Sequence, residues 1–296
     1  MLEFSKVDFK IKEYDFTTGH SFRDKMLCNG KLRKYVVKNE FNNMDIKIIK
    51  TGRSESRDYR NVFGIEPLIE CIVYELGTAL NMNIAEQELG VAKIKLNNKK
   101  QDTLVNISDS FIPYGEDLVE IGTYNGFLNN HRERIITLED LRSIVGLDPV
   151  KDLLLLDYIT MNEDRHNHNI ALLINSRTKE IKLAPIYDSG YSLLYDDVDR
   201  IGKFKNCSRN AVCNASLYNC AFSNLERLVK KYTAGRSLDG INVEYIVNKY
   251  RNRYNLIKSE HNLNNIELTD NWFNCIIEFL KWRIDLYESL QVDAYE

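Results

Sequence analysis

A polar loop near the middle of the chain carries the side chains best suited to catalysis. It reads Asn-Glu-Asp-Arg-His-Asn-His-Asn from Asn162 to Asn169 and is followed by the apolar segment Ile170–Ile174. Asp164 and Asn169 are separated by four residues, and a second aspartate, Asp188, follows the next apolar segment. Loops held between buried elements are where catalytic side chains are usually positioned. This pattern indicates a site for chemistry.

The same pattern suits the transfer of a phosphoryl group from ATP. Such a transfer needs a carboxylate that accepts the proton of the attacking hydroxyl group, and hard oxygen ligands for a magnesium ion. Asp164 fits the role of the base, while Asn169 and Asp188 fit the role of Mg²⁺ ligands. We expect His166 to lie near the γ-phosphate or to brace the loop. The sequence therefore predicts a phosphotransferase that depends on ATP and Mg²⁺.

A site of this kind also needs a lysine that contacts the phosphates and a glutamate that holds the lysine. Lys50 ends an apolar segment, and Glu70 lies on the helix expected after it. Glu66 and Glu75 are alternatives, because they lie on the same predicted helix. The spacing to the end of that helix favours Glu70 as the partner of Lys50.

Several of these residues stand in patterns shared with one known family. The patterns are Asn162-x-Asp164-x-His166-x-x-Asn169, Ala184-Pro185-x-Tyr187-Asp188, Lys50 at a strand end, and Glu70 on the next helix. In these patterns the chain resembles the HipA-like serine/threonine kinases, which include the toxin kinases of bacterial toxin–antitoxin systems. Gly30-x-x-x-Lys34 is similar to the family's phosphate-covering loop, and residues 108–116 are similar to its lobe connection. The stretch ahead of Gly30 is too short for the extra N-terminal subdomain of larger members, so the compact members are the better match.

The resemblance implies a serine/threonine protein kinase with a two-lobed, protein-kinase-like fold. It implies ATP and Mg²⁺ as cofactors, a protein substrate, and an antitoxin protein as a further partner. By the same resemblance, the residues of the site are Asp164 and His166 for catalysis, Lys50, Glu70, Gly30 and Lys34 for ATP, and Asn169 and Asp188 for the metal.

Other functions stay open on the sequence alone. Asp-Arg-His-x-x-Asn is also similar to the catalytic loop of phosphatidylinositol kinases, and aminoglycoside phosphotransferases share D-x4-N, so a lipid or small-molecule kinase is an alternative. A catalytically silent binding module would be expected to lack one of Lys50, Asp164, Asn169 and Asp188, and all four are present. His166 and His168 could ligate zinc, but no third ligand stands at a recognisable spacing. The pattern G-x-x-x-x-G-K-[ST] is absent, which disfavours a P-loop enzyme.

The elements that must position these residues divide the chain into a β-rich front and a helical rear. Alternating apolar residues predict strands at Tyr35–Val37 and Met44–Lys50, and a hairpin from Val91–Leu96 and Thr103–Ile107 around a turn at 97–102. Apolar residues at helical spacing predict a helix over Glu66–Leu80. Helix start signals in the rear part are Thr137, Asp148 followed by Pro149, and Asp270. We expect an α+β fold with an N-lobe over residues 1–110 and a mainly helical C-lobe over 111–296.

The composition of the chain limits the classes of molecule that we expect it to bind. The chain has 296 residues, of which 44% are hydrophobic, enough for two lobes with a core. Its 40 basic and 43 acidic side chains give a net charge of −3, which argues against direct binding of nucleic acid or of an anionic membrane. The first ten residues include several charged side chains and no apolar core of a signal peptide, so we expect an intracellular protein. The resemblance to the HipA-like kinases implies the bacterial cytoplasm.

Overall fold

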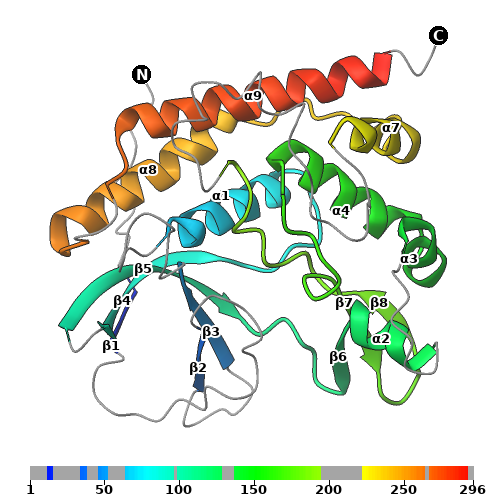
Figure 1. The fold of residues 1–296 in the computed structure, drawn as a ribbon, viewed down its shortest axis with the longest axis horizontal. Helices are drawn as coiled ribbons and strands as arrows, with labels where there is room; N and C mark the ends of the chain where they lie inside the picture. The colour runs from blue at the N-terminus through cyan, green and yellow to red at the C-terminus, as the bar shows by residue number, and fades with distance from the viewer. Residues whose placement is uncertain are drawn as a thin grey trace.

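The computed structural model describes residues 12–15, 34–38, 46–52, 64–96, 99–128, 137–194, 222–263 and 267–292. Within these ranges, strands form a five-stranded sheet and a smaller three-stranded sheet, and helices cover the larger sheet and flank the smaller one (Figure 1). The predicted α+β class is confirmed.

The larger sheet has the strand order β1-β4-β5-β3-β2. Its strands are β1 (Glu13–Asp15), β2 (Lys34–Lys38), β3 (Ile46–Thr51), β4 (Glu88–Leu96) and β5 (Lys99–Asp109). Only the β1–β4 pair is parallel among the described pairs. The predicted strands and hairpin are confirmed, but the turn predicted over 97–102 is shorter, because pairing continues to Leu96 opposite Lys99.

Helix α1 (Glu66–Ala79) lies between this sheet and helix α8 (Val243–Glu260), as Figure 1 shows. Leu68, Ile69, Ile72, Val73 and Leu76 have no exposed surface, so the helix is apolar around most of its circumference. A helix covered on two sides has this pattern rather than a single apolar stripe. The predicted helix at this position is therefore confirmed, and it is a central element of the core.

Contacts with the rear part fix α1 along its length. The carboxylate of Glu75 accepts a hydrogen bond from Lys249 of α8 at 2.7 Å. At the C-terminal end, Arg236 Nη2 donates to the carbonyl of Leu80 at 2.7 Å and also pairs with Asp152. Because Glu70 lies on α1, these contacts hold in place the helix that positions Glu70 in the candidate site.

The second sheet has the antiparallel order β6-β7-β8, with β6 (Glu116–Glu120), β7 (Ala171–Asn175) and β8 (Ile181–Leu183). The remaining described helices are α2 (Ile121–Leu128), α3 (Leu138–Val145), α4 (Leu147–Thr160), α7 (Phe222–Tyr232) and α9 (Asp270–Val292). The polar loop 162–169 runs from the end of α4 to β7. No helix in the described ranges is both long enough and apolar enough to cross a bilayer.

The helix start signals of the rear part have mixed outcomes. Thr137 caps α3 as predicted: its hydroxyl accepts from the N–H of Asp140, whose carboxylate accepts from the N–H of Thr137. The prediction that Asp148 caps the next helix is wrong, because α4 begins at Leu147 and its N-cap is Gly146. Gly146 ends α3 and starts α4 with a φ of +86°, a conformation that glycine adopts without steric cost.

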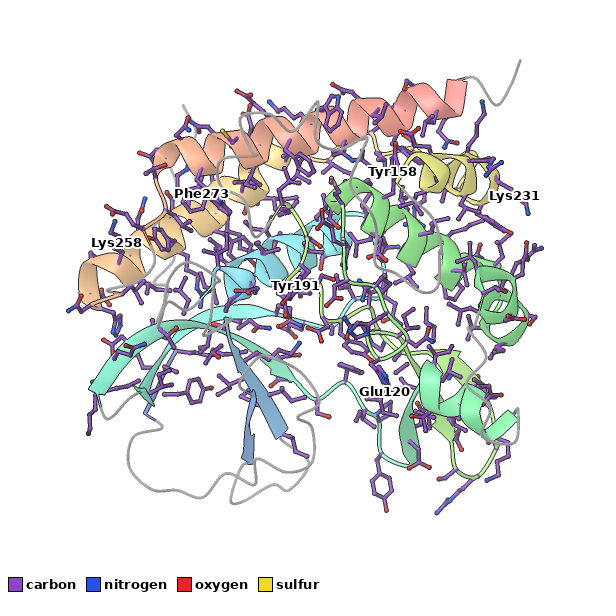
Figure 2. All side chains as sticks on the ribbon, viewed as in Figure 1. Glu120, Tyr158, Tyr191, Lys231, Lys258 and Phe273 are labelled. Carbon is purple, nitrogen blue, oxygen red and sulfur yellow. The ribbon has the colours of Figure 1, made fainter. Side chains whose placement is uncertain are left out.

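A buried arginine joins α9 to the end of α4, near the residue labelled Tyr158 in Figure 2. Arg283 donates from Nε and Nη2 to the carbonyl of Tyr158, at 3.1 and 2.6 Å. The N–H of Asn162 donates to the carbonyl of Asp157 instead, so Arg283 satisfies a carbonyl at the helix end. The guanidinium also lies 4.1 Å from the centre of the Tyr158 ring. Burial lowers the pKa of Arg283, and it raises the pKa of the Tyr158 hydroxyl to about 12.

We predict that Arg283→Met lowers the free energy of unfolding by about 2–3 kcal/mol, because it leaves the Tyr158 carbonyl buried without its donors. Urea denaturation measures the change. The control is Lys281→Met on the same helix, whose exposed pair with Glu244 contributes less than about 1 kcal/mol. Equal midpoints for the two variants would contradict the assigned role of Arg283.

Candidate active site

The polar loop is held in shape by its own amide side chains. Helix α4 ends at Thr160, and its C-cap Met161 has a left-handed φ of +54° and turns the chain into the loop. The buried Asn162 accepts a hydrogen bond from the N–H of Asp164 at 2.9 Å. Asn169 Nδ2 donates to the carbonyl of Asp164 at 2.8 Å. The predicted base and the predicted metal ligand are therefore fixed relative to one another.

Arg165 ties this loop to its surroundings. Its side chain is fully buried and pairs with Asp157 of α4, with N–O distances of 2.9–3.2 Å. Nη1 donates to the carbonyls of Asn169 and Tyr187, at 3.0 and 2.7 Å, and Nη2 donates to Ser189 Oγ at 3.2 Å. One guanidinium thus connects α4, the polar loop and both neighbours of Asp188.

Asp188 sits where the chain leaves β8 and meets α1. The N–H of Ile186 donates to the carbonyl of Asn83, at 2.9 Å, which attaches this segment to the residues after α1. Asp188 has a left-handed φ of +57°, which an aspartate tolerates better than most residues. At Gly190 an added Cβ would lie 2.9 Å from Cβ of Glu66, so only glycine allows this approach to α1.

Lys50 lies between two carboxylates from different parts of the fold. Its Nζ is 3.5 Å from Glu70 Oε1 on α1 and 3.3 Å from Asp188 Oδ1. Burial by itself would lower the pKa of Lys50, but the charges of Asp188 and Glu70 outweigh burial and raise it. The lysine is therefore a cation at neutral pH. Glu75, an alternative partner on the sequence, contacts α8 instead.

The two histidines of the loop have different surroundings. His166 Nδ1 accepts from the N–H of His168 at 3.2 Å, which assigns the proton of a neutral ring to Nε2. That Nε2 atom lies 3.9 Å from Asp164 Oδ2. His168 Nδ1 lies 2.6 Å from a carboxylate oxygen of Glu120 on β6, whose position Figure 2 labels. His166 thus faces the predicted base, while His168 faces the small sheet.

The donor set fits a magnesium ion better than zinc. Asn169 uses its amide nitrogen to hold the loop, which leaves its oxygen as a ligand, and Asp188 offers a carboxylate that is 20% exposed. Mg²⁺ is commonly bound through one or two protein oxygens together with nucleotide phosphates. Zinc prefers three or four nitrogen or sulfur ligands, and the described residues contain no group of three His, Cys, Asp or Glu side chains that could hold a metal.

Six of the predicted site residues are connected by a series of contacts. Lys50 contacts Glu70 and Asp188, and the Arg165 guanidinium connects the segment of Asp188 to Asn169. Asn169 in turn contacts Asp164, which lies near His166. Gly30 lies outside the described residues. Lys34 begins β2 opposite Lys50, but its side chain is also outside them.

Three residues that shape this site were missed by reasoning from sequence: Arg165, Asp157 and Asn106. A signal existed for the first pair, since Asp157 interrupts the apolar run Leu153–Ile159 and a buried carboxylate needs a cation. No local pattern in the sequence marks Asn106. Its side chain on β5 of the larger sheet donates a hydrogen bond to Glu70 on α1 at 2.7 Å.

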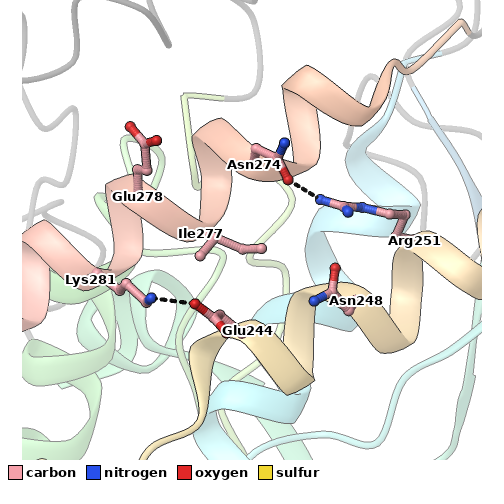
Figure 3. A pocket seen from close by; sticks show the side chains of 7 residues that line it. All are labelled: Glu244, Asn248, Arg251, Asn274, Ile277, Glu278 and Lys281. Carbon is pink, nitrogen blue, oxygen red and sulfur yellow. Dashed lines mark hydrogen bonds and ion pairs between the residues drawn. The ribbon is translucent and has the colours of Figure 1, made fainter. Parts of the chain in front are cut away.

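A separate groove of about 350 Å³ lies between α8 and α9 (Figure 3). Lys281 and Glu244 bridge it at 2.5 Å, and Arg251 reaches Asn274 at 2.5 Å. None of the candidate catalytic residues lines this groove.

Comparison with known proteins identifies the fold. No protein-family profile matches the chain. A 68-residue segment is 40% identical to the serine/threonine-protein kinase CtkA of Helicobacter pylori strain J99, and this match spans 23% of the chain but only 21% of that relative. The crystal structure of the H. pylori proinflammatory kinase CtkA is similar over 96% of this chain and 98% of its own, with a TM-score of 0.60 and 16% identity. The predicted resemblance is confirmed in fold, and so is the two-lobed kinase-like architecture.

A more distant similarity is to HipA in a complex with HipB and operator DNA, from the toxin–antitoxin system of Shewanella oneidensis MR-1. It has 12% identity and a TM-score of 0.39, and covers 91% of this chain and 66% of the other.

We predict that Arg165→Met lowers the free energy of unfolding by about 3–5 kcal/mol, since the buried charge of Asp157 would lose the guanidinium that pairs with it. Chemical denaturation followed by circular dichroism measures the change. Arg142→Met is the matched control, because Arg142 pairs with Glu139 on an exposed helix surface and its loss costs less than about 1 kcal/mol. If Arg165→Met is no more destabilising than this control, Arg165 does not hold the site together.

Proposed function

We propose that this protein is an ATP- and Mg²⁺-dependent serine/threonine protein kinase of the HipA-like family. The observation that carries the proposal is the position of Lys50 between Glu70 and Asp188, with Arg165 joining the Asp188 segment to the loop of Asp164 and Asn169. Phosphoryl transfer by kinases uses this set of a paired lysine, a base and oxygen ligands for the metal. The names of the CtkA relative support the serine/threonine class.

Each side chain has a proposed task. The side chain of Asp164 is 34% exposed and accepts the proton of the substrate hydroxyl group. The oxygen of that hydroxyl group attacks the γ-phosphorus while the bond from the γ-phosphorus to ADP breaks. Lys50 binds the phosphates of ATP with its positive charge, and Glu70 holds the lysine. His166 donates from Nε2 toward the transferred phosphoryl group or the base. Asn169 and Asp188 would hold Mg²⁺, which when bound supplies positive charge to the β- and γ-phosphates.

The lobe division belongs to the same proposal. Strand β5 of the larger sheet ends at Asp109, and β6 of the smaller sheet begins at Glu116. We therefore keep an N-lobe over residues 1–110 and a C-lobe over 111–296, with Gly30 and Lys34 at the phosphates in the N-lobe. The bacterial cytoplasm and an antitoxin partner also stay predictions, which rest on the resemblance to the family.

We predict that Asp164→Asn lowers kcat by roughly 10²–10⁴-fold, because the amide cannot accept the proton of the hydroxyl group. Asp188→Asn should cause a comparable loss and raise the Mg²⁺ concentration needed for half-maximal rate. Transfer of label from γ-³²P-ATP to protein in a bacterial lysate measures both. Glu180→Gln is the control, an exposed carboxylate in the turn between β7 and β8, and should leave the rate unchanged. Full activity of Asp164→Asn would rule out Asp164 as the base.

The substrate class is tested with the same label. We expect phosphoserine or phosphothreonine in the protein fraction, and we expect this label to be lost in Asp164→Asn. Label confined to the lipid or small-molecule fraction would instead support a phosphatidylinositol-kinase-like or aminoglycoside-phosphotransferase-like enzyme. ATP binding without any transfer would support a catalytically silent module.

A further inference from the structure

A buried amide lies directly behind the pair of Lys50 and Glu70. Asn106 is on β5, in register with Lys50 on the neighbouring strand β3. Directly opposed residues project from the same face of a sheet, so both side chains point toward α1. The carboxylate of Glu70 contacts both side chains. Its Oε1 atom lies 3.5 Å from Lys50 Nζ, and its Oε2 atom accepts a hydrogen bond from Asn106 Nδ2 at 2.7 Å. Asn106 thus holds the second oxygen of the carboxylate that holds the lysine.

Gln87 sets the orientation of the Asn106 amide. Asn106 Nδ2 also donates to Gln87 Oε1 at 2.6 Å, so both hydrogens of the amide nitrogen are used. A rotation of the amide by a half-turn would bring its oxygen against the Glu70 carboxylate and the Gln87 oxygen, and three acceptors would then oppose one another. The partners therefore fix Asn106 in the orientation that donates to Glu70.

Stability alone explains this network poorly. Asn106 is 1% exposed, and its Oδ1 has no hydrogen-bond partner among the described residues. An unpaired buried acceptor destabilises a fold, and the preceding side chain on the same face of β5, Leu104, is apolar and fully buried. What the amide supplies, and an apolar residue would not, is a fixed position for the Glu70 carboxylate.

We propose that Asn106 is a positioning residue that acts through Glu70 on Lys50, and that Gln87 orients Asn106. The inference rests on the proposed role of Lys50 in binding ATP. Without the Asn106 donor, Glu70 loses the hydrogen bond that fixes its Oε2 atom and holds Lys50 less firmly, while Lys50 keeps Asp188, at 3.3 Å, as its nearer carboxylate. The lysine then neutralises the metal-binding aspartate instead of the phosphates, and the affinity for MgATP falls.

A double-mutant cycle on MgATP binding, measured by titration calorimetry, tests this inference. We expect Asn106→Leu to weaken binding roughly tenfold, since a hydrogen bond to a charged group is worth that order of affinity. In a Glu70→Ala background the same substitution should have no further effect. Gln87→Met should weaken binding less, because it removes only the acceptor that orients Asn106. Thr103→Val is the control, a buried polar residue on the same strand whose hydroxyl contacts the Leu104 carbonyl, and it should bind like the wild type.

The outcomes separate the two proposals. Equal MgATP affinity of Asn106→Leu and wild type overturns the positioning role and leaves the proposed kinase function standing. An equal loss in both backgrounds means a general structural role and also overturns it. No MgATP binding by the wild type removes the proposed function, and the inference with it. If Asn106→Leu does not fold, the cycle is run with Gln87→Met and Glu70→Ala, and additive effects contradict the proposal.

Discussion

The candidate site depends on a single buried guanidinium, that of Arg165. Arginine has five N–H donors in a fixed plane, and each of them has an acceptor here: Asp157 for Nε and one hydrogen of Nη2, Ser189 for the other, and two backbone carbonyls for Nη1. Removing charges from water is costly, and such a pair is stable only when the geometry and the remaining hydrogen bonds compensate. A lysine at this position could not reach these acceptors with one ammonium group.

This connection matters because the site is built from segments distant in the sequence. The polar loop follows α4, Asp188 follows β8, and Lys50 and Glu70 come from the larger sheet and α1. Arg165 fixes the first two relative to each other, and Lys50 joins them to the third through Asp188 and Glu70. The helix α1 is in turn fixed by α8 through Glu75 and Lys249. The charged groups are therefore held in place by contacts within the protein itself, and such preorganisation would serve the electrostatic catalysis of the proposed reaction.

Sequence reasoning succeeded where a local pattern decides the structure. The apolar spacing of Glu66–Leu80 and the alternation near Lys50 predicted α1 and β3, and the D-x4-N pattern indicated the polar loop. It failed at Asp148, where a favourable Asp-Pro pair was outweighed by a positive-φ Gly146 that ends one helix and begins the next. The role of Arg165 was missed because its neighbours in the loop are also polar, although a buried carboxylate at Asp157 in an apolar helix requires a cation close to it. Asn106 required the register between β3 and β5, which long-range packing determines and no short motif specifies.

The proposed function requires that Asn169 and Asp188 hold a metal ion against the phosphates of ATP beside Lys50. A crystal structure with a non-hydrolysable ATP analogue and Mn²⁺ in place of Mg²⁺ tests it most directly, because anomalous scattering locates the manganese. We expect a manganese peak at coordination distance from Asn169 Oδ1 and the Asp188 carboxylate, with the phosphates next to Lys50 Nζ. Manganese or nucleotide bound at another place, with Asn169 and Asp188 uncoordinated, would contradict it.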